Sequence, residues 1–176
     1  MMSKMTLGLD RVWGVITRAG MTLGVICLLV SAVQAQTPVM PPGGGTSANP
    51  YQISQLGHLV WMTDRSAWSD IPRYYKFTKD IDASVTASWN GGAGFTPIDA
   101  YLNLMGSSGV IDGNGKVIRN LTIKPSFDKV GVGFFANLDM GWEVKNLGLV
   151  GLVVAGGYNM VGGLVGWTVV PLAGAT

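Results

Sequence analysis

The chain has 176 residues with 12 basic and 10 acidic side chains, which is enough for one domain with a modest core. The near-balanced charge excludes the strongly basic surface by which many proteins bind nucleic acid. The single cysteine, Cys27, excludes a disulfide framework.

The N-terminus has the three-part pattern of a secretory signal peptide. Lys4, Arg11 and Arg18 form a positive leader, and residues 19–33 follow without a charge. This apolar run is shorter than the roughly 20 residues that a membrane span needs. We therefore expect residues 1–35 to be removed by cleavage after Ala35, with an uncleaved anchor as the alternative. Cleavage would remove three basic residues and one acidic residue, which leaves nine of each and no cysteine.

Residues 36–50 are predicted to be a Pro/Gly-rich linker, because this composition does not favour a packed element. Residues 51–108 are predicted to hold an N-terminal cap and the first coils of the fold. Within them, Ser54 can cap a short helix whose apolar face has the spacing i, i+3, i+4, formed by Leu56, Leu59 and Val60.

The next elements are predicted to be strands and loops. Residues 74–82 alternate aromatic or apolar with polar residues, which favours a strand. Residues 88–97 are predicted to form a Gly-rich loop. In residues 109–123, two β-branched runs flank Asp-Gly-Asn-Gly at 112–115, a sequence that supplies the positive φ of tight turns. Taken alone, this stretch would equally suit a hairpin.

The last part of the chain repeats itself. V-I-R-N-L-T-I at 117–123 matches E-V-K-N-L-G-L at 143–149, with the Asn-Leu pairs 26 residues apart. V-G-V-G-F-F-A-N-L at 130–138 matches M-V-G-G-L-V-G-W at 160–167, with a spacing of 30. A period of 20–50 residues is typical of stacked repeat units. We attribute the difference of four to an insertion at a corner around residues 155–158.

Short strands at a nearly constant period predict an all-β fold of the parallel β-helix type, in which each coil adds one strand to each of several sheets. Asn120 and Asn146 are expected at equivalent corners, where their amides can satisfy turn backbone and stack as a ladder. The residues expected to point inward and stack between coils are Val117, Leu121, Ile123, Val144, Leu147 and Leu149.

The motif order resembles the GLUG-repeat proteins, a group of bacterial secreted or surface proteins that are often adhesin-like. The resemblance covers residues 45–167, and its specific part is V-K-N-L-G-L at 144–149 followed by V-G-G-L-V-G at 161–166. The other matching segments are P-Y-Q-I-S-Q-L at 50–56, Y-Y-K-F-T-K-D-I-D at 74–82, I-D-G-N-G-K-V-I-R-N-L-T-I at 111–123 and V-G-F-F at 132–135.

The resemblance implies a right-handed β-helix, an extracellular location and no defined catalytic site. Members of the group usually continue with many more repeats, whereas no polar cap is visible in residues 167–176. We therefore expect residues 109–176 to be a truncated set of GLUG-type repeats in an incomplete solenoid.

Acidic residues are the main enzymatic alternative, because β-helices also host polysaccharide lyases and hydrolases. Asp80 and Asp82 share a strand face, as a catalytic carboxylate pair would require. Asp99 and Asp112 are further candidates, with Lys79 and Arg119 as the basic residues that a lyase would use. We favour instead that Asp80 and Asp82 end a strand and bond the following turn, and that Asp112 belongs to a turn.

We predict no metal, cofactor or catalytic residue. His58 and Glu143, the only residues of their types, cannot form a zinc peptidase motif, so His58 is expected to be a half-buried residue of the cap. The loop at 112–115 lacks the later acid of a calcium site, since Ile123 takes its place. Five tryptophans are expected to cover the core rather than bind sugars: Trp61, Trp68, Trp89, Trp142 and Trp167.

The sequence therefore predicts a non-catalytic structural or adhesive segment of a secreted bacterial surface protein. A carbohydrate-active β-helix is the alternative function, and a fragment without a stable fold is a further alternative. The expected partner is a host or cell-surface glycan or protein. We expect no nucleic-acid partner and no stable membrane span after signal cleavage.

Overall fold

The computed structural model describes residues 36–64, 73–99, 108–126, 128–138 and 141–168. The expected signal peptide, Trp68 and residues 169–176 lie outside these residues. Thr37–Thr176 form one compact unit, and the fold below is that of this unit.

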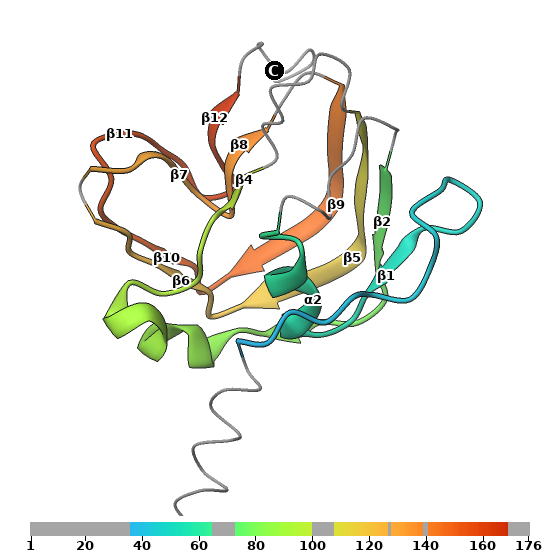
Figure 1. The fold of residues 1–176 in the computed structure, drawn as a ribbon, viewed down its shortest axis with the longest axis horizontal. Coiled ribbons are helices and arrows are strands. Elements are labelled where there is room, and N and C mark those ends of the chain that lie inside the picture. The colour runs from blue at the N-terminus through green and yellow to red at the C-terminus, as the bar shows by residue number, and fades with distance from the viewer. Residues whose placement is uncertain (1–35, 65–72, 100–107, 127, 139–140, 169–176) are drawn as a thin grey trace, which may run out of the picture. The chain divides into compact units, whose positions relative to one another are not determined.

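The described residues form an all-β fold with few helices (Figure 1). The N-terminal part contains β1 (Tyr51–Ile53), α2 (Leu56–Trp61), β2 (Arg73–Phe77), β3 (Ile81–Asp82), the 3₁₀ segment η2 (Ser84–Gly92) and β4 (Ile98–Asp99). The C-terminal part contains only strands, namely β5 (Gly109–Arg119), β6 (Thr122–Ile123), β7 (Val130–Val132), β8 (Phe135–Leu138), β9 (Trp142–Val150), β10 (Val153–Val154), β11 (Asn159–Val161) and β12 (Val165–Thr168).

Every pairing between these strands is parallel, so residues 109–123 do not form the hairpin that they would suit locally. The largest sheet has the order β1-β2-β5-β3, with β9 added on β5, and β2, β5 and β9 lie side by side in Figure 1. Three small sheets have the orders β10-β6, β11-β7 and β12-β8-β4. The strands β5–β8 therefore pair one to one, and in the same chain order, with β9–β12. We call residues 109–138 the middle coil and residues 141–168 the last coil.

The pairing corrects the predicted register of the repeat. Asp112 lies beside Lys145, and Lys116 lies beside Leu147, so the spacing is 33 and then 31 residues rather than 26. β8 and β12 pair Phe135 with Val165, which confirms the predicted spacing of 30 for the Gly-apolar blocks.

The extra residues of the repeat also lie elsewhere than predicted. A bulge between Asp112 and Lys116 gives the middle coil two more residues than the last coil has there. The spacing is 31 residues at Thr122–Val153 and 29 at Val130–Asn159, so the corner at 155–158 is shortened and holds no insertion.

Asn120 and Asn146 are consequently not at equivalent corners. Both have the left-handed backbone conformation, with φ of 59° and 54°, a conformation that asparagine tolerates better than most residues. However, Asn146 lies opposite the bulge of the middle coil, whereas Gly151 is the residue next to Asn120. The similar Asn-Leu pairs mark two different bends of the coil, and this is why matching them gave the wrong period.

The core lies between the sheets and is best buried within residues 51–98 and in the middle coil. Ile111, Ile118, Leu121, Ile123 and Phe135 are at most 1% exposed. Leu121 and Ile123 confirm the prediction that these side chains point inward. Val117 is only half-buried and lies against Gly148, and the neighbouring Ile118 points inward in its place. The other residues predicted to point inward, Val144, Leu147 and Leu149, are half-buried because they belong to the last coil.

The predicted short helix is present as α2, but Ser54 does not cap it. The N-cap residue is Gln55, which makes no side-chain capping bond, and the Ser54 amide instead donates to Nδ1 of His58 at 3.1 Å. Residues 37–50 contain no helix or strand, yet they hydrogen-bond to the cap: the Gln52 amide donates to the Pro42 carbonyl at 2.7 Å, and the Val39 amide to the Gly57 carbonyl at 3.0 Å.

The region predicted as a Gly-rich loop, residues 88–97, includes only the C-terminal part of η2. Thr86 and Ser88 hydroxyls donate to the carbonyls three residues earlier, at 2.6 and 3.0 Å, which stabilises this tight turn. The buried Thr86 hydroxyl also accepts the Thr122 amide at 3.0 Å, so η2 covers the edge of β6. Glycine and asparagine with positive φ then end the segment, at Asn90, Gly91 and Gly92.

Candidate functional site

The acidic residues considered for catalysis are bound to neighbouring backbone and side chains. Asp80 accepts hydrogen bonds from the Val117 amide at 3.1 Å and from the Arg119 guanidinium at 3.2 Å. Asp82 accepts from the amide and the hydroxyl of Ser84 at 3.0 and 3.2 Å. Asp82 therefore bonds the turn after its strand, as predicted, whereas Asp80 bonds a neighbouring coil.

Asp112 has the predicted role in a turn. Its Oδ1 accepts the Asn114 amide at 2.8 Å, across the Asp-Gly-Asn step. The same oxygen accepts the Asn146 side-chain amide of the last coil at 3.1 Å. The Asn114 side chain in turn donates to the Phe77 carbonyl of β2 at 3.1 Å. This corner therefore connects the coils through side chains as well as through the strands.

Aspartate and asparagine form three such pairs between coils. Asn120 donates to Asp82 at 3.4 Å, Asn146 to Asp112 at 3.1 Å, and Asn137 to Asp99 at 3.1 Å. The predicted asparagine ladder is therefore wrong in its partners: each amide bonds a carboxylate of the preceding coil rather than another amide. Asp82, Asp99 and Asp112 therefore connect successive coils.

These contacts lower the pKa of the carboxyl groups. The pKa of Asp80 is lowered chiefly by the Val117 amide, that of Asp82 by the Ser84 amide, and that of Asp112 by the Asn114 amide. A general acid that works near neutral pH needs a raised pKa. None of these three carboxyl groups has the environment of such an acid.

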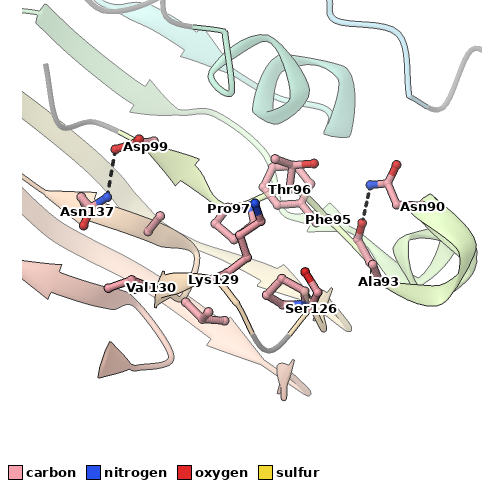
Figure 2. Close-up of a pocket in the computed structure, with 15 residues that line it drawn as sticks. Asn90, Ala93, Phe95, Thr96, Pro97, Asp99, Ser126, Lys129, Val130 and Asn137 are labelled. Carbon is pink, nitrogen blue, oxygen red and sulfur yellow. Dashed lines mark hydrogen bonds between the residues drawn. The ribbon is translucent and has the colours of Figure 1, made fainter. Parts of the chain in front are cut away.

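A pocket of about 400 Å³ opens between the loop after η2, the turn before β7, and the strands β7 and β8 (Figure 2). Its apolar lining includes Phe95, Pro97, Pro125, Val130 and Val132. Its polar lining consists of Asn90, Thr96, Asp99, Ser126, Lys129 and Asn137. The volume and the mixed lining are typical of pockets that bind small molecules, which measure roughly 300–1,000 Å³.

Hydrogen bonds hold the two ends of this pocket. Asn137 donates to Asp99 at one end, and Asn90 donates to the Gly94 carbonyl at 2.8 Å at the other, as the dashed lines in Figure 2 show. Gly94 has a φ of 85°, and a Cβ there would lie 2.2 Å from the Thr122 carbonyl oxygen, so the wall requires glycine. Lys129 makes no salt bridge with a described residue and supplies a positive charge at the pocket.

The pocket could not be located from the sequence by a motif. Its residues come from positions 90–99 and 125–137, which face each other only because the chain returns after one coil. The correct length of one coil would have located the pocket. The Phe95 amide donates to the Thr122 carbonyl at 2.8 Å, and this contact between successive coils places the Gly-rich loop beside the β6–β7 turn.

His58 and the described tryptophans have structural environments. His58 is 3% exposed and is therefore more buried than predicted. Its Nε2 lies 3.0 Å from the side-chain amide nitrogen, Nε2, of Gln55. Burial lowers the pKa of its imidazole. Trp89 and Trp142 are buried at 6% and 7% exposure and cover the core as predicted, and Trp61 packs edge-on against Tyr51. The same prediction is wrong for Trp167, which is 39% exposed.

The described part of the chain has neither a cluster of metal-binding side chains nor a helix suited to a membrane. It holds no group of three or more His, Cys, Asp or Glu residues that could bind a metal ion. No helix within the described ranges is both long enough and apolar enough to cross a membrane.

Comparison with known proteins finds similarity to short parts of long proteins. Halomucin from Haloquadratum walsbyi is 39% identical over 129 residues, which cover 72% of this chain and 1% of halomucin. A protein described as a Gly-rich membrane protein, from Evansella cellulosilytica, is 32% identical over 138 residues, which cover 77% of this chain and 15% of that protein. No protein-family model and no solved structure matches the chain.

Proposed function

We propose that the chain is a structural, adhesive segment of a secreted or cell-surface protein, built as a right-handed parallel β-helix with GLUG-type repeats. The observation that carries the proposal is the one-to-one parallel pairing of β5–β8 with β9–β12 in unchanged chain order. Such pairing is what successive coils of a solenoid produce. The right-handed sense follows the strong preference of crossovers between parallel strands.

The location of the segment is inferred from two independent features. The similarity to proteins named halomucin and Gly-rich membrane protein favours a place at or outside the cell surface. The N-terminal sequence favours export. These features support a scaffold that displays its loops outside the cell.

The adhesive part of the proposal rests on the pocket beside β7. Asparagine, threonine and lysine side chains can bond the hydroxyl and acidic groups of a glycan, and proline and valine side chains can contact its apolar faces. A carbohydrate-cleaving function gains no comparable support, because Asp80, Asp82 and Asp112 are bonded within the stack. We therefore favour glycan binding without cleavage.

A fractionation experiment tests the location. Intact cells that express the natural chain are treated with a protease, and the chain is followed by immunoblotting. We expect it in the medium or on the surface, where the protease removes it. A chain that is protected in intact cells and released only by lysis would contradict the proposed location.

A glycan array with the purified protein tests the adhesive function. We expect binding to a subset of glycans and loss of that binding in Lys129→Ala. Lys79→Ala is the matched control, because it removes an exposed lysine that does not line the pocket. Equal binding by both variants would exclude the pocket as the adhesive site, and absence of binding by the unmodified chain would contradict adhesion to glycans.

A further inference from the structure

Lys129 supplies the positive charge of the pocket beside β7. Its side chain is exposed and makes no hydrogen bond or salt bridge with a described residue. Figure 2 shows Lys129 across the pocket from Thr96. The Asp99–Asn137 pair lies at one end of the pocket, and Asn90 lies at the other. A ligand in the pocket would therefore meet an ammonium group whose N–H donors are available.

Two acidic side chains are the possible internal partners of Lys129, and both are bound elsewhere. Asp128 does not line the pocket, and it accepts a hydrogen bond from the Ser126 hydroxyl. That hydrogen bond is the main cause of the lowered pKa of Asp128, to which the charge of Lys129 contributes less. Asp99 lines the pocket and accepts the Asn137 side-chain amide at 3.1 Å. Neither carboxylate therefore forms a close ion pair with Lys129.

The uncharged polar side chains determine where the acid group of a ligand would fit. The exposed Thr96 hydroxyl makes no hydrogen bond with a described residue, so it can donate to a ligand oxygen. The Asn90 amide group already donates to the Gly94 carbonyl at 2.8 Å, which leaves its side-chain oxygen to accept from a sugar hydroxyl. At the other end, the carboxylate of Asp99 would repel an anion and attract hydroxyl donors. An acid group therefore fits best beside Lys129 and Thr96.

We propose that this pocket takes an acidic sugar, with the anionic oxygens of a carboxylate or sulfate group bound by Lys129 and Thr96. The hydroxyl groups of the sugar then lie toward Asp99 and Asn90. This inference rests on the glycan-binding function proposed above and names the class of glycan. A charge-assisted hydrogen bond is roughly twice as strong as one between neutral groups. The charge of Lys129 therefore selects acidic sugars over neutral sugars of the same shape.

Matched pairs of oligosaccharides test this preference by isothermal titration calorimetry with the purified complete chain. One pair is a uronic-acid oligosaccharide and the same molecule with its carboxyl groups reduced to alcohols. The other pair is a sulfated oligosaccharide and its desulfated form. We expect the acidic member of at least one pair to bind about tenfold more tightly than its neutral counterpart. The preference should decrease as added salt screens the charge.

Variants of Lys129 connect the preference to the pocket. Lys129→Gln removes the charge and keeps a long polar side chain. It should bind the acidic member about tenfold more weakly and the neutral member as before, so that the preference disappears. Lys129→Arg keeps the charge and should retain the preference. Lys124→Gln is the matched control, because Lys124 is an exposed lysine shortly before the pocket turn that does not line the pocket, and it should leave both affinities unchanged.

Failure of this inference and failure of the proposed function give different results. Equal affinity for the two members of both pairs would overturn the acidic class and leave glycan binding in place. A preference that persists in Lys129→Gln, or that is lost equally in Lys124→Gln, would overturn the binding of the acid group by Lys129, provided that the circular dichroism spectra are unchanged. No binding of any of the four oligosaccharides would overturn the inference together with the proposed glycan site.

Discussion

Gly113→Ala offers a direct test of how the middle and last coils lie against each other. Gly113 is in β5, and a Cβ at this position would lie 2.3 Å from the Asn146 carbonyl oxygen and 2.3 Å from the Leu147 Cα. Both obstacles are backbone, so the only relief is separation of β5 from β9. Overpacking of this kind costs about 1–3 kcal/mol, and we expect the upper end of that range because no flexible side chain can give way.

Gly115→Ala is the matched control two residues away. Gly115 has a φ of 72°, and a Cβ there would meet nothing within 4 Å. The cost of this substitution is then only that of the left-handed conformation, about 1 kcal/mol. The loss in free energy of unfolding should therefore differ by about 2 kcal/mol between the two alanine variants, although the residues are near neighbours in one Gly-rich sequence.

Urea unfolding followed by far-ultraviolet circular dichroism measures this difference. The midpoint should fall further for Gly113→Ala than for Gly115→Ala, with similar slopes for all three proteins. Equal losses, or a larger loss at Gly115, would refute the pairing of β5 with β9 in the register described above.

Three further predictions use the same assay. Leu121→Ala should cost about 2–5 kcal/mol because Leu121 is 1% exposed, whereas Val85→Ala at 50% exposure should stay within about 0.5 kcal/mol; similar losses would contradict the core assignment. Burial lowers the pKa of His58 from 6.5, so stability should fall as the pH drops below 6.5 toward the folded pKa, and His58→Gln should remove this dependence. Hydrogen bonds from Asn114 and Asn146 lower the pKa of Asp112 from 3.8, so the stabilisation by this carboxylate is present above pH 3.8 and is lost as the pH falls below it. Asp112→Asn should therefore make the free energy of unfolding less dependent on pH in this acid range. An unchanged pH dependence would argue against these hydrogen bonds.

The fold class could be predicted because the features that indicate strands depend only on residues close together in the sequence. Short β-branched runs ended by glycine or asparagine predict short strands, and the structure has them at β7 and β11, which end before Gly133 and Gly162, whereas β5 and β9 are longer. The Gly-apolar blocks at 130–138 and 160–167 also gave the correct spacing, since Phe135 pairs with Val165. There a buried phenylalanine and a half-buried valine occupy the same level of successive coils.

The register of the remaining strands could not be predicted by matching asparagines. Any bend of a coil that needs a left-handed residue favours asparagine or glycine, so Asn120 carries the same local signal as Asn114 and Asn146, which lie at a different bend. The bulge between Asp112 and Lys116 then shifts the count by two residues. The pocket shares this difficulty, because its two walls meet only when the length of one coil is known.

The acidic residues show why a β-coil can suggest an active site that it does not form. The spacing of Asp80 and Asp82 predicts two carboxylates on one strand face, as a glycoside hydrolase would need, but Asp80 lies before β3 rather than in a strand. In a stack of coils the same placement lets each carboxylate accept backbone amides or the side chains of the next coil, as Asp80 does from Val117 and Asp82 from Asn120. The two uses require opposite pKa shifts, and the shifts here are downward. Titration of these carboxyl groups by NMR therefore separates the interpretations: values below the ordinary range support the structural role, and one raised value near neutrality would restore the catalytic one.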